Sequence, residues 1–221
     1  MTHSMVEPPP GAWTVADLFE RFGAIPLSRV RHDPAPGTAS ERDVLEIHDR
    51  EGRLYELVDG VLVEKTVGTY ESYLAACVIQ LLGTCVKGKR LGIVLGPDGM
   101  MRLSPGLVQI PDVSFIALQR LPGRRVPRGG MAELAPDLAV EVISRGNTPR
   151  EMRQKLSEYF DAGVRLVWYV YPERREVHVH AGPEQVTVLG ERDTLDGGDV
   201  VPGFRLAVGE LFAEPGEETD I

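Results

Sequence analysis

The sequence has few cysteines, no long apolar run and little positive charge, and each shortage excludes a class of protein. Cys77 and Cys85 are the only cysteines in 221 residues. They lie on one face of an expected amphipathic helix, which favours two reduced core thiols over a disulfide, and no zinc-binding motif is present. No apolar run reaches the roughly 18 residues that span a bilayer. The first residues also lack the basic and then apolar order of a secretion signal, so we expect a cytoplasmic protein.

The charge balance is acidic, with 24 Lys and Arg against 33 Asp and Glu and a formal net charge of −9. Phosphate binding uses clustered Lys and Arg, so this balance argues against a protein that coats nucleic acid through bulk electrostatics. A local basic groove is still compatible with it. The densest positive stretch contains Arg120, Arg124, Arg125 and Arg128, and a solvated loop explains it equally well.

The chain is long enough for one well-buried core, because 43% of its residues are hydrophobic. We expect an N-terminal helix and connector over residues 1–45 and one domain over residues 46–221. A capping box of Thr14 and Asp17 predicts the start of that helix. Residues 24–42 are rich in Pro, Ser and Gly, which is typical of a connector.

Short apolar runs typical of strands follow, interrupted by two helical patterns. Asp59-Gly60 between two runs is a strong hairpin signal. Helical spacing predicts helices over residues 69–88 and 149–162, and LAVGELF is expected as a last helix. The order predicts a mixed α+β fold, with a central β-sheet flanked by helices. Strands are expected at DVLEIHD (43–49), RLYELV, GVLVEK, GIVLG, MMRLS, QIPDVSFIAL (109–118), LAVEVIS, RLVWYVY, EVHVHA and EQVTVLG.

Glu141 stands in the middle of LAVEVIS, a run in which apolar residues occupy both faces of the strand. An unpaired carboxylate there costs several kcal/mol or gives up its charge, so it needs a cation, hydrogen-bond donors or a proton. A functional Glu is favoured over a structural one. Asp112 stands just inside another apolar strand, although an Asp after Pro at a strand start is commonly a turn or cap residue. Asp137 is in the same situation, and we assign it no chemistry.

Lys155 belongs to the helix that follows the buried strand. Thr148, Pro149 and Glu151 form a complete helix start, which accounts for Glu151 structurally. Lys155 lies at the edge of the apolar helix face and can lean toward the preceding strand, or pair with Glu151 one turn earlier.

A strand, a loop and a helix can fold Lys155 back near Glu141. If Asp112 reaches the same point, the two carboxylates can hold a Mg²⁺ ion while phosphate and water fill its other positions. A nearby lysine can orient or deprotonate the water. The sequence therefore predicts a divalent-metal site as the reason for an acid inside the strand.

Several segments in order carry a family resemblance: ELVDGVLVE, IPDVSFI, PDLAVEVIS, the Lys155-Leu156 and Glu158-Tyr159 pairs, and AGVRLVWYVYP. They resemble the Uma-type family of restriction-endonuclease-like proteins over roughly residues 50–180. That family looks like a branch of the PD-(D/E)XK nuclease superfamily. The resemblance implies a restriction-endonuclease-like fold, with a central mixed sheet between helices, and a metal site made by Asp112, Glu141 and a lysine.

The sequence departs from the parent pattern at Ile143, where that pattern has its lysine two residues after the Glu. Ile143 can act neither as a base nor as a ligand. The resemblance implies that the lysine has moved to the next helix, as Lys155. Glu56 in YELVDG also matches a carboxylate of the family and is a further candidate, although an edge carboxylate before a hairpin explains it equally well.

These inferences predict a Mg²⁺-dependent endonuclease that hydrolyses DNA phosphodiester bonds, with Mn²⁺ as a substitute ion. Asp112 and Glu141 are the expected ligands, Lys155 the water-orienting group and Glu56 an outer carboxylate. The DNA substrate follows from the resemblance, since spacing alone supports only a metal-dependent site.

Two alternatives remain open. The acidic net charge and Ile143 favour a catalytically inactive nuclease-fold protein that serves as a DNA-binding or protein-interaction module. A metal-dependent hydrolase of small phosphoesters is the other. Cutting both strands of a duplex often recruits two active sites, so a homodimer is expected.

Overall fold

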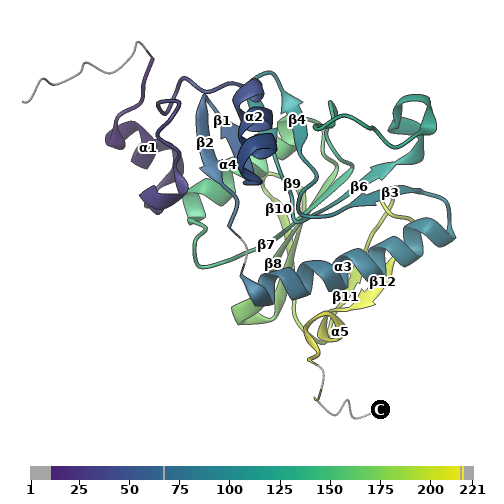
Figure 1. Cartoon of the computed structure of the whole chain (residues 1–221). Helices are drawn as coiled ribbons and strands as arrows, with labels where there is room; N and C mark the ends of the chain where they lie inside the picture. The colour runs from purple at the N-terminus through teal and green to yellow at the C-terminus, as the bar shows by residue number, and fades with distance from the viewer. Residues whose placement is uncertain (1–10, 67, 215, 217–221) are drawn as a thin grey trace, which may run out of the picture.

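A computed structural model gives the structure of residues 11–66, 68–214 and 216 (Figure 1). Its helices are α1 (Val15–Phe22), η1 (Leu27–Arg29), α2 (Glu41–Glu51), α3 (Thr69–Gly88), η2 (Leu118–Arg120), η3 (Pro122–Arg124), α4 (Pro149–Asp161), η4 (Pro172–Arg174) and α5 (Val208–Phe212), where η marks a short 3₁₀ turn. Its strands are β1 (Tyr55–Val58), β2 (Val61–Glu64), β3 (Gly92–Leu95), β4 (Met101–Ser104), β5 (Leu107–Gln109), β6 (Val113–Ala117), β7 (Leu138–Val142), β8 (Leu166–Tyr171), β9 (Glu176–Gly182), β10 (Gln185–Leu189), β11 (Thr194–Asp196) and β12 (Arg205–Ala207).

The larger sheet has six strands in the order β10-β9-β8-β7-β6-β3. Neighbouring strands are antiparallel except β7 and β8, which are parallel. A parallel pair needs a crossover connection, and α4 provides it. The sheet is therefore mixed, and α4 directly follows the buried strand β7.

Helices cover both faces of this sheet. α3 crosses one face (Figure 1) and shares a buried core with β6, β7, β8 and the C-terminal elements, including Val140 and Val142 of β7. α4 packs on the opposite face, in a cluster that includes Ala139. Because alternate strand residues face opposite sides, Glu141 points toward α4.

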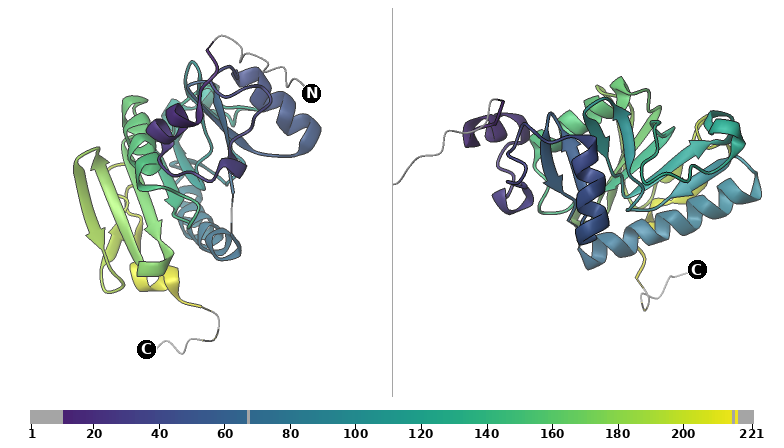
Figure 2. Two further views of the ribbon diagram at one scale, coloured as in Figure 1. Left: turned by 90° about the vertical axis from the view of Figure 1, so that its left-hand side faces the viewer. Right: turned by 45° about the horizontal axis from the view of Figure 1, so that its top comes forward.

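A smaller sheet, β2-β1-β5-β4, carries the N-terminal helices. α2 packs against it through Val44 and Ile47, and α1 packs against β1 and β2 through Leu18 and Phe22. Both helices lie at the end of the molecule that holds the small sheet (Figure 2). The sheet also contacts α4, so side chains of β1 can reach the same helix as those of β7.

The segment DVLEIHD, residues 43–49, is helical, and its prediction as a strand was wrong. α2 begins after Ser40, which forms a capping box with Asp43. Val44 and Ile47 lie three residues apart and are both buried against the small sheet. That spacing fits one helix face as well as it fits an apolar run in a strand.

The run QIPDVSFIAL is two strands in different sheets, and its prediction as one strand was wrong. β5 ends at Gln109 in the small sheet, and β6 begins at Val113 in the large one. Pro111 has no N–H to donate to a strand ladder, which suits it to the break. As a result Asp112 lies where the two sheets meet.

The remaining long elements agree with their predictions, and the mixed α+β fold is confirmed. Asp59 and Gly60 have φ angles of 50° and 75°, as a tight two-residue hairpin requires. α3 and α4 begin where apolar spacing placed them. Cys77 and Cys85 are free. No helix in the described part of the chain is long and apolar enough to cross a membrane.

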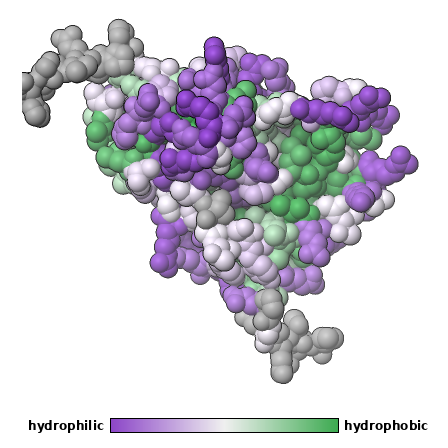
Figure 3. Space-filling view, in the orientation of Figure 1, coloured by the Kyte–Doolittle hydropathy of each residue, from purple (hydrophilic) through white to green (hydrophobic). Residues whose placement is uncertain are grey.

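The surface is uneven in polarity (Figure 3). Hydrophilic side chains cover α2, whereas an apolar area lies over β3 and β6 above α3. Half-buried side chains surround a buried cluster there, among them Ile93, Leu95, Leu118 and Leu134. β3 is the edge strand of the large sheet at this end.

Candidate active site

Asp112 and Glu141 lie side by side at neighbouring strands. β6 and β7 are antiparallel and pair with Val113 opposite Val140, so Asp112, just before Val113, lies opposite Glu141, just after Val140. Residues opposite one another in an antiparallel pair point to the same face. Oδ2 of Asp112 also accepts a 2.7 Å hydrogen bond from the backbone N–H of Val142. Both carboxylates are buried, with 7% and 6% of the residue surface exposed.

Lys155 reaches the same point from α4. Its Nζ atom lies 2.8 Å from Oε1 of Glu141 and 2.8 Å from Oε1 of Glu56. The residue sits in the second turn of α4, and helical side chains lean toward the N-terminal end, here toward the end of β7. Glu151, the alternative partner, instead pairs with Arg29.

Glu56 comes from β1 of the small sheet and points inward. Its Oε1 atom accepts a 3.0 Å hydrogen bond from the backbone N–H of Ile110 in addition to its contact with Lys155. It is buried rather than an exposed edge carboxylate. The structure therefore brings together all four residues that the sequence singled out, from β1, the start of β6, β7 and α4.

Two further side chains of this cluster were missed. Nζ of Lys65, just after β2, lies 2.9 Å from Oδ1 of Asp112 and donates to the carbonyl of Ile110. The hydroxyl of Tyr159, which the sequence assigned to the apolar face of α4, donates to Glu141. Burial and the neighbouring Glu141 raise the pKa of Tyr159 well above its usual value, so the phenol stays a donor.

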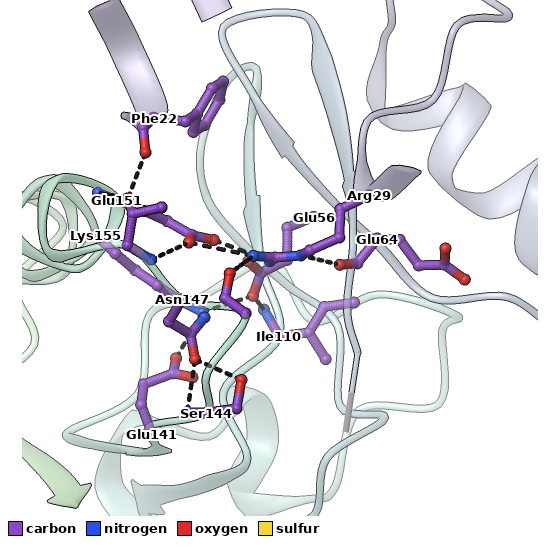
Figure 4. Close-up of polar contacts among 12 residues, drawn as sticks. Phe22, Arg29, Glu56, Glu64, Ile110, Glu141, Ser144, Asn147, Glu151 and Lys155 are labelled. Carbon is purple, nitrogen blue, oxygen red and sulfur yellow. Dashed lines mark hydrogen bonds and ion pairs between the residues drawn. The ribbon is translucent and has the colours of Figure 1, made fainter. Parts of the chain in front are cut away.

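Arg29 forms a buried ion pair at the start of α4 (Figure 4). Its Nη2 atom lies 2.9 Å from Oε1 of Glu151, and its Nη1 atom donates to Oε2 at 3.2 Å. The guanidinium also donates to the carbonyls of Gly146 and Glu64, at 2.8 Å and 3.1 Å. Glu151 closes the predicted capping box with Thr148 as well. Arg29 therefore ties the loop before α4 to the end of β2.

The described residues around this point include more acidic than basic side chains, since Glu56, Glu71, Asp112 and Glu141 lie near Arg29, Lys65 and Lys155. Burial raises the pKa of the Glu141 carboxyl to about 7, although Lys155 opposes the rise. That value of the pKa already includes the raising effect of the Asp112 and Glu56 carboxylates. Burial alone lowers the pKa of Lys155, but Glu141 and Glu56 outweigh it and the net pKa is raised. Lys155 is thus held as an ammonium group.

These side chains surround a small cavity of about 30 Å³, which we name the site recess. Its volume suits one ion or one water molecule. Within residues 11–66, 68–214 and 216, no group of three or more His, Cys, Asp and Glu side chains is placed to hold a metal by itself. Mg²⁺ needs only one or two carboxylates when water and phosphate complete its octahedron, so Asp112 and Glu141 fit this ion in ligand type and in number. The recess is lined by Arg29, Glu56, Lys65, Thr66, Glu71, Asp112, Glu141, Val142, Ser144, Asn147 and Lys155.

Other residues considered from the sequence lie outside the cluster. Asp137 accepts a 2.8 Å hydrogen bond from the backbone N–H of Ala117 and lies 3.3 Å from Arg120, which is a structural role. Ile143, at the position of the expected lysine, packs at the edge of the α4 core.

Comparison with known proteins identifies the family and the fold of the chain. The family model Uma2, described as "Putative restriction endonuclease", matches residues 41–209. Among solved structures, the chain is similar to a "putative nuclease belonging to DUF820" from Anabaena variabilis ATCC 29413. The TM-score is 0.64 at 16% identity, covering 72% of this chain and 89% of the other. No curated protein matches. The family model covers most of the sequence, and the chain therefore belongs to the Uma2 family and has a restriction-endonuclease-like fold.

Proposed function

We propose that this protein is a Mg²⁺-dependent endonuclease that hydrolyses DNA phosphodiester bonds, with Mn²⁺ as a substitute ion. Family membership supports a nuclease-like function. The observation that carries the finer proposal is the meeting of Asp112, Glu141, Glu56 and Lys155 in one buried recess. An acid-rich recess with a fixed ammonium group matches the needs of phosphodiester hydrolysis, which are a cation site and a donor beside it.

Each of these residues has a separate role in the proposal. Asp112 and Glu141 would hold the ion, and a bound Mg²⁺ supplies Lewis-acid stabilisation of the charge on the phosphoryl oxygens. Lys155 remains an ammonium group, so it donates to the attacking water and to the phosphate rather than removing a proton. Glu56 lies 2.8 Å from Lys155 and is a positioning residue for it.

Cleavage of DNA with and without the Glu141 carboxylate tests the proposal. Purified protein is incubated with supercoiled plasmid and with a labelled single strand, in Mg²⁺ and in Mn²⁺. We expect Glu141→Gln to lower the cleavage rate by at least about 10²-fold. Loss of a residue that only supports a metal ligand already costs about 10- to 100-fold in activity, and Glu141 is a proposed ligand itself. Glu133→Gln is the matched control, because the Glu133 side chain is 73% exposed and pairs only with Arg102. Equal cleavage by wild type and Glu141→Gln would contradict the proposal.

A second candidate is a nuclease-fold protein that binds DNA or another protein without cutting. The observation in its favour is that lysines already pair with the carboxylates, Lys65 with Asp112 and Lys155 with Glu141. It predicts DNA binding that is unchanged by EDTA and by Glu141→Gln. A small-phosphoester hydrolase would instead turn over an aryl phosphodiester and show no affinity for DNA.

A further inference from the structure

A second and larger pocket adjoins the site recess. It has a volume of about 640 Å³ and shares Thr66, Glu71 and Ser144 with the recess, so the two lie side by side. A phosphate and its ion do not need that much space, whereas organic ligands typically occupy pockets of about 300–1,000 Å³. Whatever group is attached to a phosphate in the recess can therefore enter this pocket, which we name the side pocket.

The side pocket combines aromatic and cationic side chains. Tyr70 comes from α3 and Tyr171 from the end of β8, and Ile143 adds apolar surface to the pocket. The Cζ atom of Arg174 lies 5.3 Å from the centre of the Tyr171 ring. Arg145 is also at the pocket, and its pair with Glu173 is solvent-exposed and therefore weak. Aromatic faces beside guanidinium groups are the usual means of holding an unpaired nucleobase.

The recess itself favours a flexible strand over a duplex. Each of the four site residues, Asp112, Glu141, Glu56 and Lys155, is less than a tenth exposed. The backbone of a bound strand must therefore bend inward to bring a phosphate to them. A strand with unpaired bases can bend in this way without the cost of breaking base stacking and pairing. The net charge of −9 also leaves little of the diffuse attraction on which duplex binding depends.

We propose that the side pocket binds the base next to the scissile phosphate, so that the preferred substrate is a DNA strand with unpaired bases. This inference rests on the proposed function for the phosphate in the recess. The position of Ile143 gives it a structural reason, because an apolar side chain where the parent pattern has lysine extends the floor of a base pocket. Stacking of one base on an aromatic side chain strengthens binding by about tenfold or more.

Binding is measured by fluorescence anisotropy of the full chain with Ca²⁺ in place of Mg²⁺. The probes are a labelled single strand, the same strand annealed to its complement, and the same strand with abasic residues. We expect the intact single strand to bind at least about tenfold more tightly than the duplex and the abasic strand. Both of these lack an unpaired base that can stack in the side pocket, and one stacked base contributes about this factor. Equal affinity for the single strand and the duplex, or for the intact and abasic strands, would overturn the inference.

Substitution of Tyr171 assigns the preference to the side pocket. Tyr171→Ala should remove most of the difference between intact and abasic strands, and Tyr171→Phe should keep it because the ring remains. Phe19→Ala is the control, since Phe19 is an aromatic residue of α1 that is 63% exposed and does not line the pocket. If Tyr171→Ala fails to fold, as judged by circular dichroism, Arg174→Ala takes its place and should weaken binding of intact strands. A preference unchanged in the folded variants would contradict the assignment.

Cleavage of the same oligonucleotides in Mg²⁺ separates this inference from the proposed function. Cleavage of single strand and duplex at equal rates would overturn the inference and leave the endonuclease proposal intact. A base preference in binding without cleavage of any strand would leave the side pocket assigned and overturn the endonuclease proposal. Absence of binding to every strand would overturn the inference whatever the cleavage assay gives.

Discussion

Glu141 is the residue on which the chemistry of the site depends. It stands in a strand whose other side chains are all buried, and it contacts Lys155 at 2.8 Å and the hydroxyl of Tyr159. These partners do not compensate fully for burial, because the pKa of Glu141 is still raised to about 7. An additional cation near Asp112 and Glu141 would stabilise the ionised carboxylate, which is why the metal proposal begins from this residue.

The raised pKa of Glu141 predicts a pH-dependent stability. Native Glu141 keeps its proton up to about pH 7, whereas the unfolded residue loses it near 4.5, so the native state binds more protons between these values. The free energy of unfolding should therefore fall with rising pH across this window. Relative to Glu141→Gln, we expect wild type to lose about 1–3 kcal/mol between about pH 5 and pH 7.5. Urea unfolding in EDTA measures this difference, and a gain in relative stability with rising pH would contradict it.

At the scale of elements, the start of α4 positions Lys155. Lys155 lies four residues after Glu151, one turn further along the same helix face. The Arg29 guanidinium holds Glu151 and the carbonyl of Gly146 in the preceding loop. The orientation of α4, and with it the approach of Lys155 to Glu141, therefore depends on a buried ion pair from the N-terminal part of the chain.

Loss of Arg29 should be costly, and loss of its partner's charge should reduce the cost. Arg29→Met leaves the Glu151 carboxylate buried without its cation, so we expect a loss of about 3–5 kcal/mol in the free energy of unfolding. Arg29→Met with Glu151→Gln should recover part of it, because Gln can still close a capping box. Arg31→Met is the control, since its two-contact pair with Glu51 is more exposed and should cost about 1 kcal/mol or less. Urea unfolding of wild type and the three variants measures these differences. Equal losses in the free energy of unfolding for Arg29→Met and Arg31→Met would contradict this account.

The sequence predicted elements well where the local signal had one interpretation. The Thr148 capping box and the Asp59-Gly60 turn each specify one geometry. The segment at residues 43–49 has two interpretations, because its apolar residues three positions apart fit a helix whereas its β-branched residues favour a strand. The break at Pro111 was overlooked because the apolar residues on both sides read as one continuous run.

At the scale of the whole molecule, the site could be predicted only in part. Glu141 was identifiable because an acid in a buried strand conflicts with burial, and Lys155 because a short connection returns it to that strand. Lys65 was not, since its meeting with Asp112 depends on how the second sheet, which the sequence did not indicate, lies against the first. Contacts between distant segments have no local signal in the sequence, and Arg29, Lys65 and Glu71 reach the recess through such contacts.

The overall charge predicts a weak dependence of strand binding on salt. Affinity for a single strand falls by about 0.7 logarithmic units per phosphate neutralised for each tenfold rise in salt. With few basic groups near the recess, we expect two or three phosphate contacts and a slope between about −1 and −2. Anisotropy titrations over a KCl series at constant Ca²⁺ measure the slope. A slope steeper than about −5 would indicate an extended basic groove and contradict this picture.

The central claim is that Asp112 and Glu141 together hold a divalent cation. Calorimetric titration of Mn²⁺ into the metal-free protein tests it most directly, with wild type, Asp112→Asn, Glu141→Gln and the control Glu133→Gln measured side by side. We predict one ion per chain in wild type and in Glu133→Gln, and loss of that binding in both site variants. Absence of Mn²⁺ binding to wild type, or binding to Asp112→Asn or Glu141→Gln as tight as to wild type, would contradict the claim.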